Sequence, residues 1–296
     1  MTIRKALIPA AGLGTRLFPA SKSVKKEMFP IIGQDGIARP LIHYNVLEAL
    51  SIGCEEIGIV IQPRDESIFR SFFDELPEDL HERYAKDERN ASIETELTAL
   101  SRKIVYIHQP EQQGFGHAVY CARDWIGDGS FLLMLGDHLF KSANSKTCAR
   151  QLAEVFQKFQ GSVSGVQQTP VHMLKYFGTL TGEPIDVTKH IYKVTHICEK
   201  PSAEYARAHL NVPGLPADQY LCFFGMHIFT SKIFDMLEYQ ISRKMRERGE
   251  YQLTSAQERL RSLDGQYYAV EIQGERFDIG IPSEFKRTIA RFGEPI

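Results

Sequence analysis

The chain has 296 residues, of which 43% are hydrophobic and 24% are charged, and its formal net charge is −2 at pH 7. This composition is that of an ordinary globular protein with enough chain for a buried core, and it excludes disordered, collagen-like and disulfide-scaffold proteins. Because 35 basic residues stand against 37 acidic ones, the bulk charge gives no reason to expect a nucleic-acid polymer or a membrane surface as a partner.

The start of the chain and the cysteines favour a cytoplasmic protein without a membrane span. No apolar run approaches the ~20 residues that cross a bilayer. The apolar stretch 6–14 follows Arg4 and Lys5 but contains a proline and two glycines, which makes it a poor signal region. The five cysteines are widely spaced without a Cys-x-x-Cys pair. We expect them to be buried, reduced thiols.

The first half of the chain alternates apolar runs with helical patterns. Helical spacing of apolar residues predicts helices over 40–51, 66–75 and 117–125. Compact apolar runs predict strands over 3–8, 57–61, 104–107 and 131–135. Strands that are apolar throughout and separated by helices favour parallel pairing, with helices on both faces of the sheet.

A charged segment interrupts this alternation, and the pattern of strands and helices changes beyond residue 160. Residues 77–101, just before the third strand, are charged and predict a helical excursion with a solvated face. Beyond residue 160 we expect strands over 162–167, 192–197 and 221–228, interrupted by helices over 203–209, 232–239 and 253–262. Since no linker or repeat divides the chain, we expect a single α/β domain with a mixed, mostly parallel sheet.

A loop of small residues directly follows the first predicted strand. Residues 9–17 read Pro-Ala-Ala-Gly-Leu-Gly-Thr-Arg-Leu. Small residues allow close approach of the backbone to a ligand, and successive amides can bind an anion. Leu17 stands where the dinucleotide-binding fingerprint needs its third glycine, and the segment that follows is poor helix material. The loop is therefore neither that fingerprint nor a Walker loop.

Cations on the same connection suggest a polyphosphate ligand. Arg16 follows Gly14 by two residues, and Lys26 precedes Phe29 and Pro30. A guanidinium fork and an ammonium point charge that converge on such a loop suit phosphate oxygens. We interpret Lys22 and Lys25, on the same segment, as solubilising surface lysines.

Further motifs follow this loop in a fixed order. They are Lys-Glu-Met-Phe-Pro at 26–30, Gln109 with Gly-Phe-Gly-His-Ala at 114–118, Leu-Gly-Asp at 135–137, Tyr-Phe-Gly at 176–178, Glu-Lys-Pro at 199–201, Glu-Tyr-Gln-Leu-Thr at 250–254 and Asp-Ile-Gly at 278–280. In this order they resemble the signatures of the sugar-1-phosphate nucleotidylyltransferases, and more narrowly those of the bacterial UTP–glucose-1-phosphate uridylyltransferases. The shared order from residue 9 to residue 280 makes the resemblance specific.

The resemblance implies an enzyme that transfers a uridylyl group from UTP to glucose 1-phosphate, giving UDP-glucose and pyrophosphate. The sugar phosphate would attack the α-phosphorus in line, so catalysis rests on positioning and charge neutralisation. It further implies a Rossmann-like fold in one domain, with residues 1–160 as the nucleotide-binding half and 161–296 as the sugar-binding and C-terminal part. UTP and a sugar 1-phosphate are the implied partners, and a homo-oligomer, dimer or tetramer, is the implied assembly.

The resemblance also assigns catalytic and metal-binding residues. Arg16 would contact the departing β- and γ-phosphates, and Lys26 the triphosphate near the α-phosphate. Asp137, at the end of a predicted strand, and Asp278 would hold Mg²⁺, a hard ion that takes few carboxylates together with substrate oxygens.

Binding residues follow in the same way. Glu199 would accept hydrogen bonds from sugar hydroxyls, Lys200 would neutralise the sugar phosphate, and Gly178 would meet the sugar. His117 is expected to cap or pack at the start of its helix. The implied nucleotide-binding residues are Ala11, Gly12, Gly14, Thr15, Gln109 and Gly114.

Departures from the family pattern leave alternatives open. His138 follows Asp137, Gly136 replaces a common proline, and Ile279 replaces a cysteine found in many relatives. These differences leave the reaction type intact, but they leave room for another nucleotide such as dTTP, or another hexose 1-phosphate. From different classes, a non-catalytic regulator that binds a nucleotide sugar and a nicotinamide-dependent dehydrogenase are the remaining alternatives.

Overall fold

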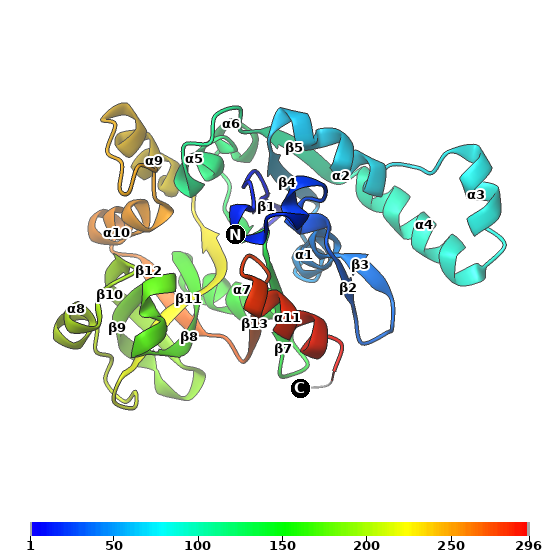
Figure 1. The fold of residues 1–296 in the computed structure, drawn as a ribbon. Helices are drawn as coiled ribbons and strands as arrows, with labels where there is room; N and C mark the ends of the chain where they lie inside the picture. The colour runs from blue at the N-terminus through cyan, green and yellow to red at the C-terminus, as the bar shows by residue number, and fades with distance from the viewer. Residues whose placement is uncertain (1, 295–296) are drawn as a thin grey trace.

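The protein folds around a large mixed sheet flanked by helices (Figure 1). The computed structural model describes residues 2–294. Its strands are β1 (Lys5–Pro9), β2 (Pro30–Ile32), β3 (Ala38–Pro40), β4 (Glu56–Ile61), β5 (Ile104–His108), β6 (Phe131–Met134), β7 (His138–Ser142), β8 (Ser162–Pro170), β9 (Gly178–Asp186), β10 (Ile191–Glu199), β11 (Gln219–Phe229), β12 (Tyr267–Glu271) and β13 (Gly274–Asp278).

Nine of these strands form the main sheet, in the order β5-β4-β1-β6-β11-β8-β12-β10-β9. The β5-β4-β1-β6 segment is parallel throughout, whereas β11 runs antiparallel to β6 and β8. Two small sheets, β13-β7 and β2-β3, complete the strand pairing. The helices are α1 (Leu41–Leu50), α2 (Glu66–Phe73), α3 (Glu78–Tyr84), α4 (Glu88–Ser101), α5 (Phe115–Tyr120), α6 (Arg123–Ile126), α7 (Cys148–Phe159), α8 (Ala203–His209), α9 (Lys232–Ser242), α10 (Leu253–Asp264) and α11 (Pro282–Arg291).

Alternating side chains of the central strands supply two hydrophobic cores, one on each face of the sheet. In β1, Ala6 and Ile8 pack into the core that contains Val46 of α1. Leu7, between them, packs into the opposite core with Val119 of α5. Because side chains alternate along a strand, one apolar run serves both layers of helices. The expected α/β fold with helices on both faces is confirmed.

The carboxyl ends of β1 and β6 lie side by side at one edge of the sheet. Their parallel pairing brings the loop after Pro9 next to the segment 135–137. A Cβ added to Gly136 would lie 2.4 Å from the carbonyl oxygen of Pro9, so this close approach requires glycine. Open α/β sheets bind their ligands at this edge.

Several elements differ from the sequence-based expectation. The helix expected over 117–125 is broken into α5 and α6, and α7, α11, β2, β3, β7, β9, β12 and β13 were not predicted. The amphipathic pattern of α7 was readable, since Leu152, Ala153 and Phe156 share its buried face. The pairing of β7 with β13 could not be predicted from the sequence, because it joins segments more than 130 residues apart and has no local signal.

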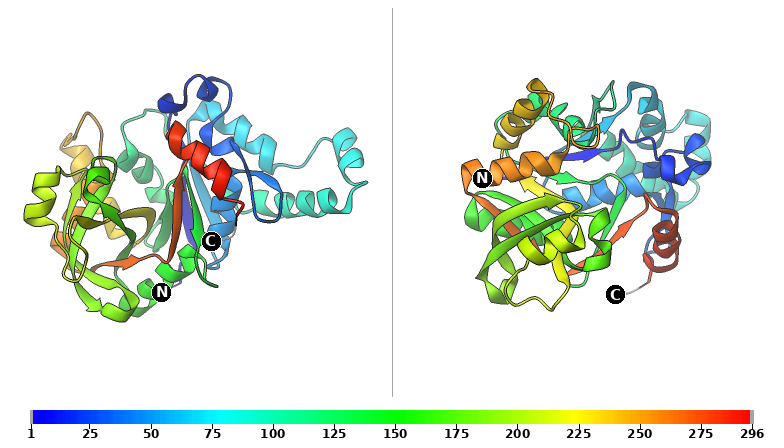
Figure 2. Two further views of the ribbon diagram at one scale, coloured as in Figure 1. Left: turned by 60° about the horizontal axis from the view of Figure 1, so that its bottom comes forward. Right: turned by 60° about the vertical axis from the view of Figure 1, so that its left-hand side comes forward.

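The charged excursion is helical, as expected, and forms α3 and α4. Both helices extend away from the rest of the molecule (Figures 1 and 2). Leu97 and Leu100 of α4 are buried against one core, whereas α3 has no buried residue. All five cysteines are free thiols, as predicted, but Cys121 and Cys198 are only half-buried, whereas burial was expected for all of them. No helix within residues 2–294 is long and apolar enough to cross a membrane.

A half-buried glutamate joins α1 to α7. Glu48 Oε1 accepts a hydrogen bond of 2.6 Å from the backbone N–H of Ala149, in the first turn of α7. Next to it, Ser51 Oγ lies 2.7 Å from Oγ1 of Thr147, the N-cap of α7. Burial raises the pKa of Glu48 from 4.5 to about 7. The folded protein therefore holds this proton more tightly than the unfolded chain does.

We expect Glu48→Gln to remove one pH-dependent component of stability. In the wild type, the free energy of unfolding should fall by about 1–3 kcal/mol as the pH rises from 4.5 to 7, because the unfolded carboxyl ionises first. The amide keeps an acceptor for Ala149 but cannot ionise. Urea denaturation between pH 4 and 8 measures the effect, with exposed Glu82→Gln on α3 as control. A wild-type-to-variant difference that is constant with pH would contradict the assignment.

Candidate functional site

Two adjoining cavities open at the carboxyl edge of β1 and β6. The loop cavity, of about 450 Å³, lies over the loop 9–15, and the wide cavity, of about 600 Å³, extends from it toward β10 and α10. The two share Phe115, Leu135, Asp137 and Glu250 as lining residues. Asp137 therefore stands where a ligand in one cavity would meet a ligand in the other.

The loop cavity collects the residues expected to bind a nucleotide. Two glutamine side chains hold the backbone of its loop, because Gln62 Nε2 and Gln112 Nε2 both donate to the carbonyl oxygen of Ala11, at 3.0 and 2.5 Å. Gln112 was not singled out from the sequence, although it lies three residues after Gln109. The expected residues that line this cavity are Ala11, Gly12, Gly14, Thr15, Lys26, Gln109 and Gly114.

Lys25 also holds this loop, and its interpretation as a solubilising surface lysine is wrong. Its Nζ lies 2.8 Å from Asp65 Oδ2 and donates to the carbonyl oxygen of Gly12 at 2.9 Å. The side chain is only 12% exposed. Lys22 is exposed, as interpreted. The difference arises because Asp65, after β4, lies beside the loop only in the folded chain.

Gln109 is buried and oriented by the start of α5. Its Nε2 donates to Nδ1 of His117 at 3.0 Å and to the carbonyl oxygen of Gly114 at 3.2 Å. These contacts occupy the amide nitrogen and leave the amide oxygen for a partner in the cavity. Burial lowers the pKa of His117, which favours the neutral ring that accepts this hydrogen bond. The expectation that His117 packs at the start of its helix agrees with this contact.

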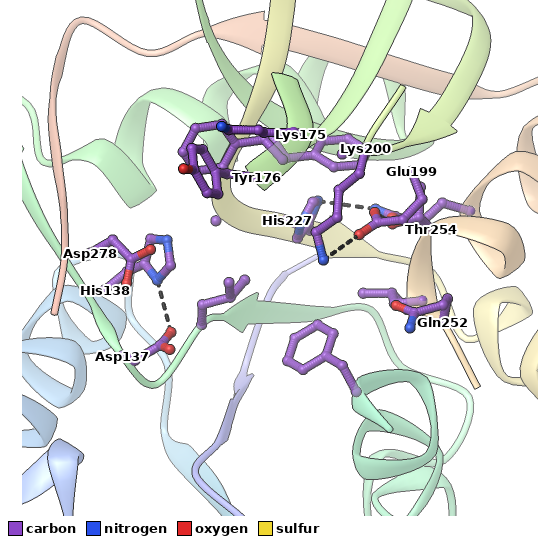
Figure 3. A pocket seen from close by; sticks show the side chains of 18 of the residues that line it. Asp137, His138, Lys175, Tyr176, Glu199, Lys200, His227, Gln252, Thr254 and Asp278 are labelled. Atoms are coloured by element: carbon purple, nitrogen blue, oxygen red, sulfur yellow. Dashed lines mark hydrogen bonds and ion pairs between the residues drawn. The ribbon is translucent and has the colours of Figure 1, made fainter. Parts of the chain in front are cut away.

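Two carboxylates and an imidazole meet at the boundary of the cavities. His138 pairs with Asp278 across the β7-β13 sheet, so the chain segments 137–138 and 278 are neighbours. One ligand atom from each of Asp137, His138 and Asp278 lies within 4.8 Å of the others. His138 Nδ1 is 2.9 Å from Asp137 Oδ1, a contact drawn in Figure 3. This donor set fits a divalent cation, with hard carboxylate oxygens that suit Mg²⁺ and one nitrogen that also suits transition metals.

Lys26 is paired with Asp137 in this acidic cluster. Its Nζ lies 2.7 Å from Asp137 Oδ2 and 3.7 Å from Glu27 Oε1. Burial by itself would lower the pKa of Lys26, but the charges of Asp137 and Glu27 outweigh it and raise that pKa. Burial by itself would raise the pKa of Asp137, but Lys26 and His138 hold it well below 3.8. Both members of the pair are therefore charged at neutral pH.

Glu27, next to this pair, is buried with a raised pKa. Only 1% of its surface is exposed, and its Oε2 has no hydrogen-bond partner among the described residues. Burial raises its pKa to about 7, against the lowering effect of Lys26 and Lys25. The Glu27 carboxyl therefore keeps its proton to a higher pH than an exposed glutamate does.

Arg16 reaches the same cluster from the loop after β1. A Cβ added to Gly280 would lie 2.9 Å from Asp137 Oδ2, 3.0 Å from Asp278 Oδ1 and 3.2 Å from an amino nitrogen of Arg16. Gly280 therefore leaves the space in which these charged groups converge. Arg16 itself is exposed and lines the wide cavity, so its guanidinium is available to an anionic ligand.

The far side of the wide cavity carries the residues expected to bind a sugar phosphate. Glu199, at the end of β10, accepts a hydrogen bond of 2.6 Å from Thr254 Oγ1, and Lys200 Nζ lies 3.1 Å from its other oxygen (Figure 3). Gly178 lines the same wall, where an added Cβ would lie 2.6 Å from the ring of Phe223. Thr254 was not assigned from the sequence, although it ends the quoted Glu-Tyr-Gln-Leu-Thr motif.

Comparison with known proteins gives one consistent family. The family model described as nucleotidyl transferase matches residues 5–291. The UTP–glucose-1-phosphate uridylyltransferase of Bacillus subtilis is 34% identical over 292 residues, covering 98% of this chain and 91% of that protein. A UDP-glucose pyrophosphorylase complexed with UDP-glucose has a TM-score of 0.78 at 26% identity, covering 98% of both chains. A UTP-bound enzyme of this type from Acinetobacter baumannii has a TM-score of 0.80 at 27% identity, covering 99% of this chain and 94% of that one.

We expect Lys26→Met to shift acid unfolding to higher pH. Because the folded pKa of Asp137 is depressed, its ionisation stabilises the protein above the unfolded pKa near 4, and this contribution is lost as the pH falls through the folded value. Without Lys26 the carboxylate loses its ammonium partner and keeps only His138, so stability at pH 7 should drop by about 3 kcal/mol. Chemical denaturation between pH 3 and 8 measures both effects, with exposed Lys22→Met as the matched control. If the free energy of unfolding falls with pH in the same way below pH 5 in the wild type and in Lys26→Met, the ion pair does not stabilise the ionised Asp137 as stated.

Proposed function

Since the chain belongs to the nucleotidyl transferase family, we propose that it transfers a uridylyl group from UTP to glucose 1-phosphate, releasing pyrophosphate and forming UDP-glucose. The relatives named above carry this activity in their names, and they match nearly the whole chain. The activity is therefore that of a nucleotidyltransferase in UDP-glucose synthesis.

The arrangement of the two cavities is the observation that carries this function. A loop of small residues with Lys26 lines one cavity, a carboxylate and an ammonium line the far wall of the other, and Asp137 lies between them. A nucleoside triphosphate in the loop cavity and a sugar phosphate in the wide cavity would bring their phosphates together at Asp137. This is the geometry that a transfer between two phosphorylated substrates requires.

The reaction needs no nucleophile from the protein. A phosphate oxygen of glucose 1-phosphate forms a bond to the α-phosphorus of UTP, and the bond between the α- and β-phosphates breaks to release pyrophosphate. We assign Lys26 to the α-phosphate, Arg16 to the departing pyrophosphate and Lys200 to the phosphate of the sugar. Fixed cations in a partly enclosed site stabilise the charge that develops in such transition states.

We assign the divalent cation that this chemistry uses to Asp137 and Asp278, and we propose Mg²⁺. Two carboxylate oxygens suit this ion, which keeps the rest of its coordination for water and substrate phosphates. When bound, it neutralises phosphate charge during the transfer. Lys26, now 2.7 Å from Asp137 Oδ2, would then share this carboxylate with the ion.

The remaining expectations concern the binding residues, the domain and the assembly. We propose Ala11, Gly12, Gly14, Thr15, Gln109 and Gly114 as the nucleotide contacts, and Gly178 with Glu199 as the sugar contacts. One continuous sheet joins the two halves, because β11 pairs with both β6 and β8, and we propose a single domain on that basis. The homo-oligomer and the cytoplasmic location stay predictions.

Pyrophosphate release tests the function directly. We expect the highest kcat/KM for UTP with glucose 1-phosphate in Mg²⁺, among all nucleoside triphosphates paired with a panel of hexose 1-phosphates. Arg16→Ala should lower that value by a factor of about 10²–10³, because a charge-stabilising group is lost, whereas exposed Arg83→Ala on α3 should not change it. A higher kcat/KM with dTTP or with another hexose 1-phosphate would keep the reaction type and change the assigned substrate. If no pair of nucleoside triphosphate and hexose 1-phosphate releases pyrophosphate, only the interpretation as a nucleotide-sugar-binding regulator would be left.

A further inference from the structure

A buried histidine on β11 lines the wide cavity without a role in the assignments above. His227 is 3% exposed and lies on the cavity wall between Tyr176 and Lys200 in the view of Figure 3. It follows a break in the pairing of β11 with β8, between Phe223 and His227, where Gly225 has a φ of 92°. This irregular segment forms part of the cavity wall.

The ring of His227 is held by a buried chain of polar groups. Its Nδ1 lies 2.8 Å from Ser164 Oγ and 3.3 Å from Gln257 Nε2. Ser164 Oγ is also 2.7 Å from the hydroxyl of Tyr267, to which Gln257 Nε2 donates at 2.9 Å. Within residues 2–294 these are the polar contacts of the ring, and none of them involves Nε2.

Counting donors along this chain determines the tautomer. The amide nitrogen of Gln257 can only donate: it donates to the Tyr267 hydroxyl at 2.9 Å and makes a longer contact of 3.3 Å with Nδ1 of His227, whose single lone pair it shares with Ser164. The Tyr267 hydroxyl then donates to Ser164, and the Ser164 hydroxyl donates to Nδ1. With Nδ1 an acceptor, the proton of the neutral ring lies on Nε2.

The surroundings keep the ring neutral and its orientation constant. Burial lowers the pKa of His227 to about 3, so the imidazole carries no charge at neutral pH. Phe229 stacks on the ring at 5.3 Å between centroids, and Phe223 meets it edge-on at 5.0 Å. Nε2–H is thus a neutral, oriented donor for which the protein supplies no acceptor.

We propose that His227 is a specificity-determining residue whose Nε2–H donates a hydrogen bond to a hydroxyl oxygen of the hexose ring in the wide cavity. The inference rests on the proposed function, since it names a contact of that enzyme's sugar substrate. A neutral donor beside the ring of Phe223 suits a hydroxyl, whereas the phosphate already has Lys200 and Arg16 at the same cavity. A buried donor left without its acceptor is costly, so this contact discriminates against sugars that lack the hydroxyl.

Deoxy sugars combined with one substitution test the contact. The wild type is assayed with UTP and glucose 1-phosphate or its 2-, 3-, 4- and 6-deoxy analogues. We expect His227→Phe to lower kcat/KM for glucose 1-phosphate about tenfold, mainly through KM, with the KM for UTP unchanged. For the one deoxy analogue that lacks the contacted hydroxyl, His227→Phe should not lower kcat/KM below the wild-type value. A loss of equal size for every sugar would overturn the proposal.

A second buried histidine supplies the matched control. His43 of α1 is 1% exposed, packs against Phe72 and Phe73, and does not line either cavity. His43→Phe should leave the pattern across the sugars unchanged, whatever it does to stability. His227→Gln, which restores an N–H donor, should recover part of the discrimination. A hydroxyl-specific loss in His43→Phe would also count against the proposal.

The tautomer is testable in the wild-type protein if His227→Phe does not fold. Two-bond ¹⁵N–¹H NMR spectra of ¹⁵N-histidine-labelled protein should show a His227 ring protonated at Nε2, and UDP-glucose should shift this N–H resonance. Protonation at Nδ1, or no shift on saturation, would overturn the inference. Activity of the wild type with glucose 1-phosphate separates this failure from failure of the proposed function, because an inactive wild type overturns both.

Discussion

The partly buried ion pair between Lys26 and Asp137 is the interaction on which the site depends. It joins the segment after β1 to the end of β6, and the pairing of His138 with Asp278 brings the last strand to the same point. Three parts of the chain that are far apart in sequence thus share one charged centre. The pair keeps both groups ionised at neutral pH. The positive and negative charges that phosphate transfer needs are therefore present before a substrate binds.

The cavity walls follow one rule, in which the protein satisfies one edge of a buried polar group and leaves the other edge to a ligand. The amide nitrogen of Gln109 is occupied by His117 and Gly114, and Nδ1 of His227 is held by Ser164. Each group is oriented before binding, so less entropy is lost when the substrate binds. The same contacts set which tautomer or amide edge the ligand meets.

Much of the candidate site was readable from the sequence because its residues lie in short motifs beside strand ends. The loop 9–17 and Asp137 follow apolar runs that form β1 and β6, and such strand ends face ligands in doubly wound sheets. Lys25 was misinterpreted because its partner Asp65 follows a different strand. His227 gave no signal at all, since a histidine within the apolar strand β11 is indistinguishable by pattern from a histidine that only packs.

The sequence by itself determined the α/β class, the nucleotide-binding loop, the family resemblance and the charged residues that this chemistry uses. These follow from local patterns, because strand and helix periodicity and motif spacing are properties of neighbouring residues. Only the tertiary structure decided that Asp278 meets Asp137 through the β7-β13 pairing, that Lys25 holds the loop backbone, and that His227 lines the wide cavity. Each depends on contacts between segments distant in the chain, and such contacts exist only once the sheet has formed.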